Sequence, residues 1–478
     1  MFVPLLFCIY SFVDHLFFTC IVALLYSLYW VGLAIVNMIW AWPLFSALAF
    51  AGFCLNGYLD DFVFDYPRWP TTSAMTVEHP DEARQSSTAA WLDAQRAIID
   101  FTFFSPPGAP LPDAPTRLEL RAQANARLVR AFGINNSLTT SSTRIHEQFR
   151  RKAARLINET SQDSGRWTRL YNLAEGALKR DIVLTLIAAE PLGLADCVRR
   201  MCLAVVLVDN FGDEAIVHAE GGVLGKIAAR VNEVWVGSKC DQGGEGGKDE
   251  ELEEMIAGLG LREKRGQGEV LRVGEVLGII MPQYETLWRV VLLTFVTAFH
   301  RQPREENAKR VEGVPGCLGE EDGEALKLAQ VSSVPPGEEE FGLTLWKQEG
   351  LRLYPSNKRI YRARGIGMEG QVSGDVEACH RNAEIWGDDA LEFRPERFDG
   401  LSDMQKRAYF PYSMGRHKCP ANQAFGNRMI TMLAVVLSRV LSPAVGKVTF
   451  GDDKLDGDAG AALPTGRDEL EAWAMEFF

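Results

Sequence analysis

The chain has 478 residues, of which 47% are hydrophobic and 24% charged, and its net charge is −13. This length and composition exclude a disordered tail, a collagen-like chain and a disulfide miniprotein. The acidic balance argues against a nucleic-acid binder, because phosphate contacts need clustered lysine and arginine. Nine cysteines without any C-x-x-C pair fit neither a disulfide framework nor a zinc site.

Residues 1–57 are predicted to be a membrane anchor. Asp14 is the only formal charge before residue 60, and the uncharged run 16–36 has the length of one membrane-spanning helix, about 20 residues. Residues 38–55 could supply a second span, so one and two passes both fit. A cleaved signal peptide fits poorly, because no basic segment precedes the apolar run.

A short hinge and a long domain of soluble character follow the anchor. Residues 58–73 contain Pro67 and Pro70, which favour an extended, semi-rigid segment. Arg68 and Arg84 follow the apolar sequence, so the positive-inside rule places the remaining domain, residues 74–478, in the cytosol.

Helical periodicity dominates residues 74–478, so we predict a mainly α domain with a small β portion. Strand-like runs are few, and residues 357–364 form the best of them. Two stretches rich in glycine and charge, 238–268 and 303–340, are predicted surface loops. The predicted helices cover residues 144–158, 170–189, 270–300 and 422–441.

The segment PYSMGRHKCPANQAFG, residues 411–426, presents a cysteine before a predicted helix. Pro420 follows Cys419, and proline is favoured in the first turn of a helix. The helix dipole and the cationic residues 416–418 would both favour the thiolate form of Cys419, which is a ligand for a soft metal or a haem iron. Taken alone, a cysteine is more often an ordinary buried residue.

This segment resembles the haem-binding loop of the cytochrome P-450 superfamily, F-x-x-G-x-[HR]-x-C-x-[GA]. Gly415, His417, Cys419 and Ala421 match it, and Tyr412 stands where the family prefers phenylalanine. The resemblance implies the family's helical fold with short sheets, and a haem b whose iron is bound by the Cys419 thiolate. It points to the eukaryotic, membrane-anchored, fungal-like type.

Two further motifs precede the cysteine in the family's order. Glu349 and Arg352 form E-x-x-R within LWKQEGLRLYP, and Arg397 lies in P-E-R-F. Either motif alone could be a solvated ion pair or a polar loop. By the resemblance, the three residues form a buried charge triad around the haem, in which each charge depends on its partners.

The resemblance also implies residues that hold the haem propionates. Arg362, on the predicted strand, and His417 are expected to contact these carboxylates, by charge-assisted hydrogen bonds. The family's W-x-x-x-R helix is not found, and Arg150 and Arg151 are weak substitutes for it.

The oxygen-activating motif [AG]-G-x-[DE]-T-[TS] has an altered counterpart in MPQYETLWRVV. Glu285 and Thr286 match its acid–alcohol pair, which delivers protons to bound dioxygen in the family. Pro282 and Gln283 replace the small residues. Pro282 should free the carbonyl of Gly278 and kink the helix, whereas Gln283 could crowd the iron.

The resemblance implies a monooxygenase that inserts one oxygen atom from O2 into a lipophilic small molecule. Electrons would come from NADPH through a separate NADPH–cytochrome P-450 reductase, since no glycine-rich nucleotide motif is recognised. The expected location is the endoplasmic reticulum membrane, with a cytosolic catalytic domain and no nucleic-acid partner. Two alternatives stay open: an oxygen-independent isomerase or dehydratase, and a non-catalytic haem-binding membrane protein.

The sequence also predicts a basic surface near Cys419. Lys406, Arg407, Arg416, Lys418 and Arg428 would make the cysteine side locally basic, for docking a reductase or as a solvated rim.

In the family, the turn at residues 356–358 faces the distal pocket. Lys358 there would need an acidic partner, such as a substrate carboxylate or Glu285, unless it reaches water. The hypothesis is a lipophilic substrate with one acidic end.

Overall fold

The computed structural model describes residues 80–162, 164–217, 222–240, 248–262, 269–301, 338–422 and 425–478. The predicted anchor 1–57 and hinge 58–73 lie outside the described residues, as do most of the predicted loop 303–340 and parts of the loop 238–268.

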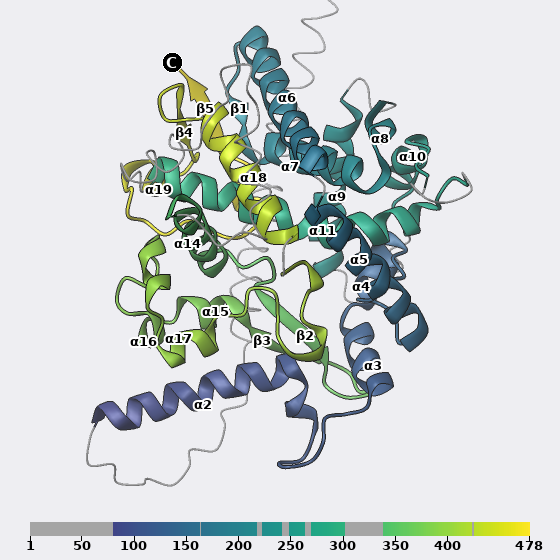
Figure 1. Cartoon of the computed structure of the whole chain (residues 1–478), viewed down its shortest axis with the longest axis vertical. Helices are drawn as coiled ribbons and strands as arrows, with labels where there is room; N and C mark the ends of the chain where they lie inside the picture. The colour runs from purple at the N-terminus through teal and green to yellow at the C-terminus, as the bar shows by residue number, and fades with distance from the viewer. Residues whose placement is uncertain are drawn as a thin grey trace, which may run out of the picture. The chain divides into compact units, whose positions relative to one another are not determined.

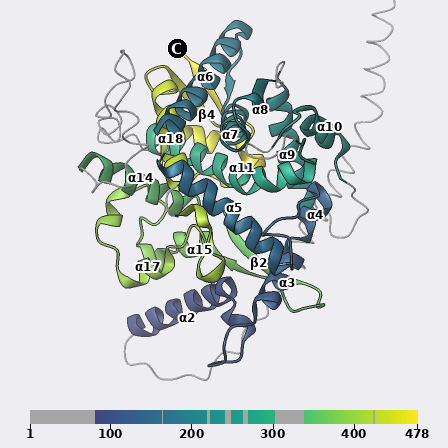
Figure 2. The ribbon, with the colours of Figure 1, turned by 45° about the vertical axis from the view of Figure 1, so that its right-hand side comes forward.

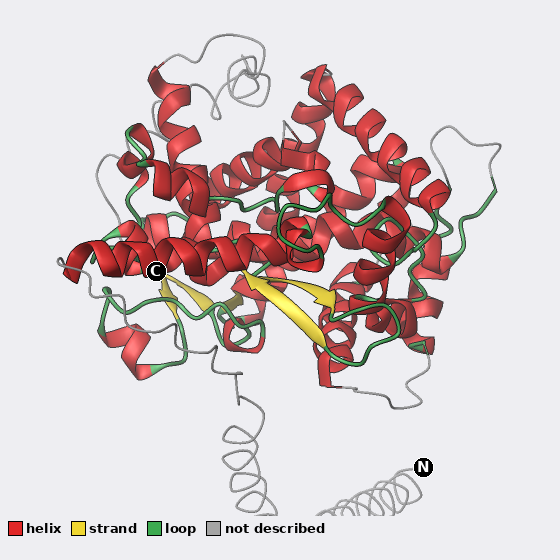
Figure 3. Cartoon of the chain, turned by 90° about the horizontal axis from the view of Figure 1, so that it is seen from below, coloured by secondary structure: helices red, strands yellow, loops and turns green. Residues whose placement is uncertain are grey.

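The described chain is mainly helical with two small sheets, which confirms the predicted fold class (Figure 3). All four predicted helices form. They are α5 (Thr143–Gln162), α6 (Ser164–Ala188), α11 (Val273–Phe295) and α18 (Phe425–Val440). A π-helical turn, Val296–Arg301, continues α11.

The other described helices include several that the hydrophobic periodicity of the sequence did not predict. They are α2 (Pro80–Asp100), α3 (Ala114–Ala124), α4 (Ala126–Phe132), α7 (Leu194–Phe211), α8 (Glu214–Val217), α9 (Val223–Cys240), α10 (Glu250–Gly258), α14 (Glu338–Leu353), α15 (Val376–Arg381), α16 (Ala383–Trp386), α17 (Asp403–Ala408) and α19 (Asp453–Gly457).

Both sheets are antiparallel. The predicted strand is β2 (Arg359–Ala363), which pairs with β3 (Gln371–Asp375) so that Arg362 lies opposite Val372. In the other sheet, β5 (Ala474–Phe477) runs between β1 (Leu192–Gly193) and β4 (Gly446–Thr449). This sheet brings the C-terminal strand beside the start of α7.

The core forms where α11 packs against α7 and α18 (Figures 1 and 2). Nearly every residue of α7 is buried, as its apolar sequence requires. Of the described helices, one, Val273–Arg301, is long and apolar enough to span a membrane, but most of it is buried inside the protein. It is the central helix of this core.

Pro282 lies inside α11, which runs unbroken through it. Proline has no N–H, so the carbonyl of Gly278 loses its helical partner, as predicted. The buried side chain of Asn136 supplies the replacement, since its Nδ2 donates to Gly278 O at 2.9 Å. A residue 142 positions away therefore compensates the proline.

We predict that Asn136→Ala lowers the free energy of unfolding by about 1–3 kcal/mol, because it leaves a buried carbonyl without a donor. In a Pro282→Ala background the restored N–H can donate to Gly278 O, so the same change should cost less. Urea unfolding of the two single variants and the double variant measures this coupling. Additive losses would show that the two residues do not share this carbonyl.

Candidate functional site

The loop that carries Cys419 is a series of tight turns between α17 and α18. Gly415 has φ +66°, and a Cβ there would lie 3.3 Å from the Cβ of Asp100, so both conformation and space favour glycine. The Cys419 N–H donates to the carbonyl of Tyr412 at 2.9 Å, and the Tyr412 hydroxyl donates to Asn427 Oδ1 at 2.8 Å. These bonds tie the loop to the first turn of α18.

The Cys419 thiol is exposed, whereas the other free cysteines that the structure describes, Cys197, Cys202 and Cys379, are buried. Desolvation by the surrounding protein nevertheless raises its pKa, and the Ala421 N–H and Arg121 only oppose this rise. Without a ligand, the surrounding protein therefore favours the neutral thiol of Cys419 and not the expected thiolate. A 3₁₀ turn, Pro420–Asn422, follows the cysteine, and α18 begins only at Phe425.

Three basic side chains gather near the loop that carries Cys419. Arg121, from α3, lies with its Nη1 3.4 Å from His417 Nδ1. Arg362, from β2, donates to the carbonyl of Ile99 at 3.0 Å and lies over the ring of Phe101 at 4.4 Å. The His417 ring is 5.2 Å from the same ring. Residues from three segments thus form one group, which we call the Cys419 basic cluster: Arg121, Arg362 and His417.

The Cys419 basic cluster lacks an acidic partner. Desolvation and mutual repulsion lower the pKa of Arg121 to about 10, of Arg362 to about 9 and of His417 to about 3. Among the described residues no carboxylate forms an ion pair with any of the three, and Arg362 Nε and His417 Nε2 are buried without a hydrogen-bond partner. Buried cations of this kind require an anion.

A haem beside Cys419 fits these residues. Its two propionates would supply the missing negative charge, and its iron would take the accessible thiol as a thiolate. Arg121 is suited to both tasks, because its positive charge lowers the pKa of Cys419 and it also contacts His417.

Neither Arg121 nor His146 was predicted from the sequence to lie near this site. The His146 ring lies 5.4 Å from the His417 ring, and Arg150, one helical turn later, lowers the pKa of both His146 and Arg121. His146 and Arg150 have the spacing of W-x-x-x-R with histidine in the place of tryptophan, which is the signal that could have identified α5. Arg151 instead pairs with Glu147 on the exposed face.

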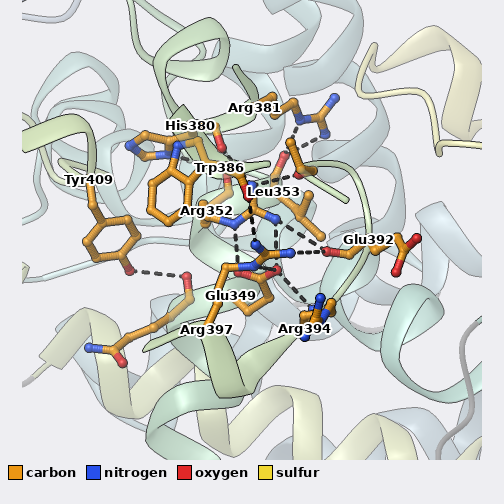
Figure 4. Close-up of polar contacts among 12 residues, drawn as sticks. Glu349, Arg352, Leu353, His380, Arg381, Trp386, Glu392, Arg394, Arg397 and Tyr409 are labelled. Atoms are coloured by element: carbon orange, nitrogen blue, oxygen red, sulfur yellow. Dashed lines mark hydrogen bonds and ion pairs between the residues drawn. The ribbon is translucent and has the colours of Figure 1, made fainter. Parts of the chain in front are cut away.

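The structure brings the predicted triad together (Figure 4). Arg352 Nε lies 2.6 Å from Glu349 Oε2, and Arg397 Nε lies 3.0 Å from Glu349 Oε1. Glu349 and Arg352 are 0% exposed. The network therefore joins α14 to the 3₁₀ turn Pro395–Asp399.

Backbone groups satisfy the rest of the network (Figure 4). Arg352 donates to the carbonyls of His380 and Ala390, both at 2.7 Å, and the Arg394 N–H donates to Glu349 Oε1 at 2.9 Å. His380 Nε2 accepts from the Phe410 N–H at 3.0 Å, so Nδ1 carries the proton that reaches Arg352 O at 3.2 Å. The buried charges are thus fully hydrogen-bonded.

The predicted acid–alcohol pair lies on α11 with partners of its own. Glu285 is buried 2.5 Å from Arg467 Nη1, and desolvation raises its pKa. The Thr286 hydroxyl donates to the carbonyl of Pro282 at 3.1 Å. The Gln283 amide exchanges hydrogen bonds with Asn210 of α7, at 3.1 and 3.2 Å, so its side chain points at α7.

Two other sequence interpretations change. Lys358 Nζ lies 3.9 Å from Glu377 Oε2, so a protein carboxylate that the sequence did not suggest stands beside it. Arg428 is buried over the Trp167 ring at 5.8 Å and does not belong to the basic surface. Lys406, Arg407, Arg416 and Lys418 remain exposed.

The C-terminal part of the chain is similar to known proteins. A sequence model of the family described as Cytochrome P-450 matches residues 366–442. Cytochrome P-450 72A397 of Kalopanax septemlobus is 28% identical over 242 residues, which are 43% of this chain and 42% of that protein. Cytochrome P-450 72A13 of Arabidopsis thaliana is 30% identical over 141 residues, 27% of this chain and 26% of that protein.

A bacterial relative is also similar to this chain. A bifunctional cytochrome P-450/NADPH–P-450 reductase of Bacillus subtilis is 30% identical over 97 residues, 20% of this chain and 9% of that protein. The matched part of the chain thus spans less than half the length of each of these relatives. Two are plant proteins and none of the three is fungal, so they lend no support to the expected fungal-like type.

We predict that Glu349→Gln lowers the free energy of unfolding by about 3–5 kcal/mol. It leaves buried Arg352 without a counter-charge, and Arg397 keeps only its 3.4 Å contact with Asp389 Oδ1. Glu147→Gln is the matched control. It breaks the Glu147–Arg151 ion pair, whose side chains are 62% and 77% exposed, and should cost no more than about 0.5 kcal/mol. Chemical unfolding of both variants measures the difference, and equal losses would contradict a structural role for the triad.

Proposed function

Because the chain belongs to the cytochrome P-450 superfamily, we propose that it is a haem-thiolate monooxygenase. The reaction is insertion of one oxygen atom from O2 into a lipophilic small molecule. Electrons come from NADPH through a separate reductase.

One observation carries this proposal: an exposed cysteine thiol stands beside buried basic residues that no described carboxylate pairs with. Cys419 would bind the iron, while Arg121 and Arg362 would hold the propionates and neutral His417 would donate a hydrogen bond to one of them. Tyr412 and Gly415 shape the loop under the macrocycle. A haem with a thiolate ligand supplies reductive activation of dioxygen, since the thiolate favours cleavage of the O–O bond.

Partners and location belong to the same proposal. The Bacillus subtilis relative is named for a fused reductase, which supports a reductase as the electron donor here. The exposed residues Lys406, Arg407, Arg416 and Lys418 offer it a basic docking face. The apolar residues 1–57 would attach the chain to the endoplasmic reticulum membrane in one or two passes, with the catalytic domain in the cytosol.

A second candidate function rests on the partners of Glu285 and Thr286. The acid is held by Arg467 and the alcohol donates within α11, so both groups have partners within the protein in this arrangement. This favours the alternative of an oxygen-independent isomerase or dehydratase on the same fold. Turnover that requires neither O2 nor NADPH would identify it, and binding without any turnover would identify a non-catalytic haem protein.

We predict that Cys419→Ser abolishes the red-shifted Soret band of the reduced, carbon-monoxide-bound protein, because serine cannot provide the thiolate. Cys379→Ser is the control, since Cys379 is buried in a separate apolar cluster with Trp386 and Phe410. It should keep the band. Retention of the band in Cys419→Ser would refute the assignment of the iron ligand.

We predict that Thr286→Ala uncouples the enzyme, so that NADPH is consumed while peroxide replaces product. Loss of the alcohol misdirects the proton that the oxygen chemistry requires. Thr431→Ala is the control, because Thr431 makes the same bond within α18, to the carbonyl of Asn427 at 3.0 Å. Product formed per NADPH is the measurement. An unchanged ratio in Thr286→Ala would exclude this residue as the proton-delivering alcohol.

A further inference from the structure

Arginine and tryptophan side chains alternate along a line from α7 to α4, which we call the Arg–Trp ladder. Arg199 lies over the Trp288 ring at 5.3 Å, and Arg467 lies over the same ring at 5.6 Å. Arg467 is also 5.1 Å from the Trp235 ring, and Arg127 is 4.6 Å from that ring. Each indole thus has two guanidinium groups near it, in the range where cation–π attraction acts.

Carboxylates neutralise the ladder at its inner end. Arg199 contacts both Glu471 and Asp196 at 2.5 Å. Arg467 contacts Glu285 at 2.5 Å. The two inner arginines therefore have local counter-charges.

The outer end of the ladder has none. Arg127 donates to Ser238 Oγ at 2.6 Å, and no described carboxylate forms an ion pair with it. Lys239, the next residue on α9, is exposed, and desolvation together with Arg467 and Arg127 lowers its pKa. Arg127 and Lys239 are called the outer cation pair below.

The balance of charge behind this pair is also positive. Buried Arg289 repels Lys239 and donates only a 3.3 Å hydrogen bond to the carbonyl of Pro355. Glu285 is the one acid among the groups that act on Lys239, and it already contacts Arg467. An unpaired guanidinium that is half-buried in this way is stabilised by an external anion.

The outer cation pair interacts electrostatically with residues near the candidate haem site. Arg127 lies in α4, which follows directly on α3 with Arg121. Arg127 also interacts with Tyr361, the β2 neighbour of Arg362. Glu285, which acts on both members of the pair, precedes Thr286 on α11. Lys358 is a weaker candidate for binding an anion, because the Glu377 carboxylate already lies beside it.

We propose that Arg127 and Lys239 bind the carboxylate of an otherwise apolar substrate. This inference rests on the proposed function and specifies its substrate class. The guanidinium fork of Arg127 matches a carboxylate in bidentate geometry, and the Lys239 ammonium adds a second charge-assisted hydrogen bond. The Trp235 ring, 4.6 Å from Arg127, is an aromatic group next to this anchor.

Equilibrium dialysis of the full chain against dodecanoate and against its methyl ester tests the proposal. Dodecanoate should bind about tenfold more tightly than the ester, because only the acid can form charge-assisted hydrogen bonds. Arg127→Gln and Lys239→Gln should each remove most of this preference while leaving the affinity for the ester unchanged. Arg130→Gln, an exposed arginine on the same helix, is the matched control and should keep the preference.

Equal affinity for acid and ester in the unaltered chain would overturn the proposal, as would a full preference in Lys239→Gln. Lys239 is exposed, so this variant carries the test even if Arg127→Gln does not fold. The measurement needs no turnover. The carbon-monoxide spectrum of the same preparation tests the haem-thiolate function separately, so failure of either can be distinguished.

Discussion

The buried triad of Glu349, Arg352 and Arg397 is the interaction on which the C-terminal half of the described chain depends. It joins α14 to residues 380–397, a segment with little regular structure to hold it. Charges that are 0% exposed are stable only when every donor and acceptor is occupied. The segment's carbonyls meet that condition, so its irregular path is determined by the arginines it surrounds.

Two other groups of positive charge have no ion-pair partner among the described carboxylates, in contrast to the triad. One lies beside Cys419 and the other is the outer cation pair, Arg127 and Lys239. In each, the chain supplies several basic groups, but no described carboxylate pairs with the outermost ones. Such unpaired charge lowers the stability of the protein without a ligand. The lost stability is recovered when an anion binds. Each of the two groups would therefore be stabilised by a bound anion.

Central helix α11 shows how a break in a local rule is compensated at a distance. Pro282 removes a helical donor, and Asn136 replaces it. Gln283 occupies a position where the family has a small residue, and Asn210 binds its amide. Glu285 carries a charge into the core, and Arg467 opposes it. Each compensating residue belongs to a different part of the chain, so the altered motif is sustained by packing.

The motifs around Cys419, the helical class and the features that depend on near neighbours could be predicted from the sequence. The turn at Gly415, the one-turn spacing of Glu349 and Arg352 and the free carbonyl of Gly278 follow from local backbone geometry. The contacts between distant residues, such as Arg121 with His417 and Asn136 with Gly278, became visible only in the folded structure. The physical reason is that contacts between remote segments depend on how the helices pack, and no local pattern of residues encodes that packing.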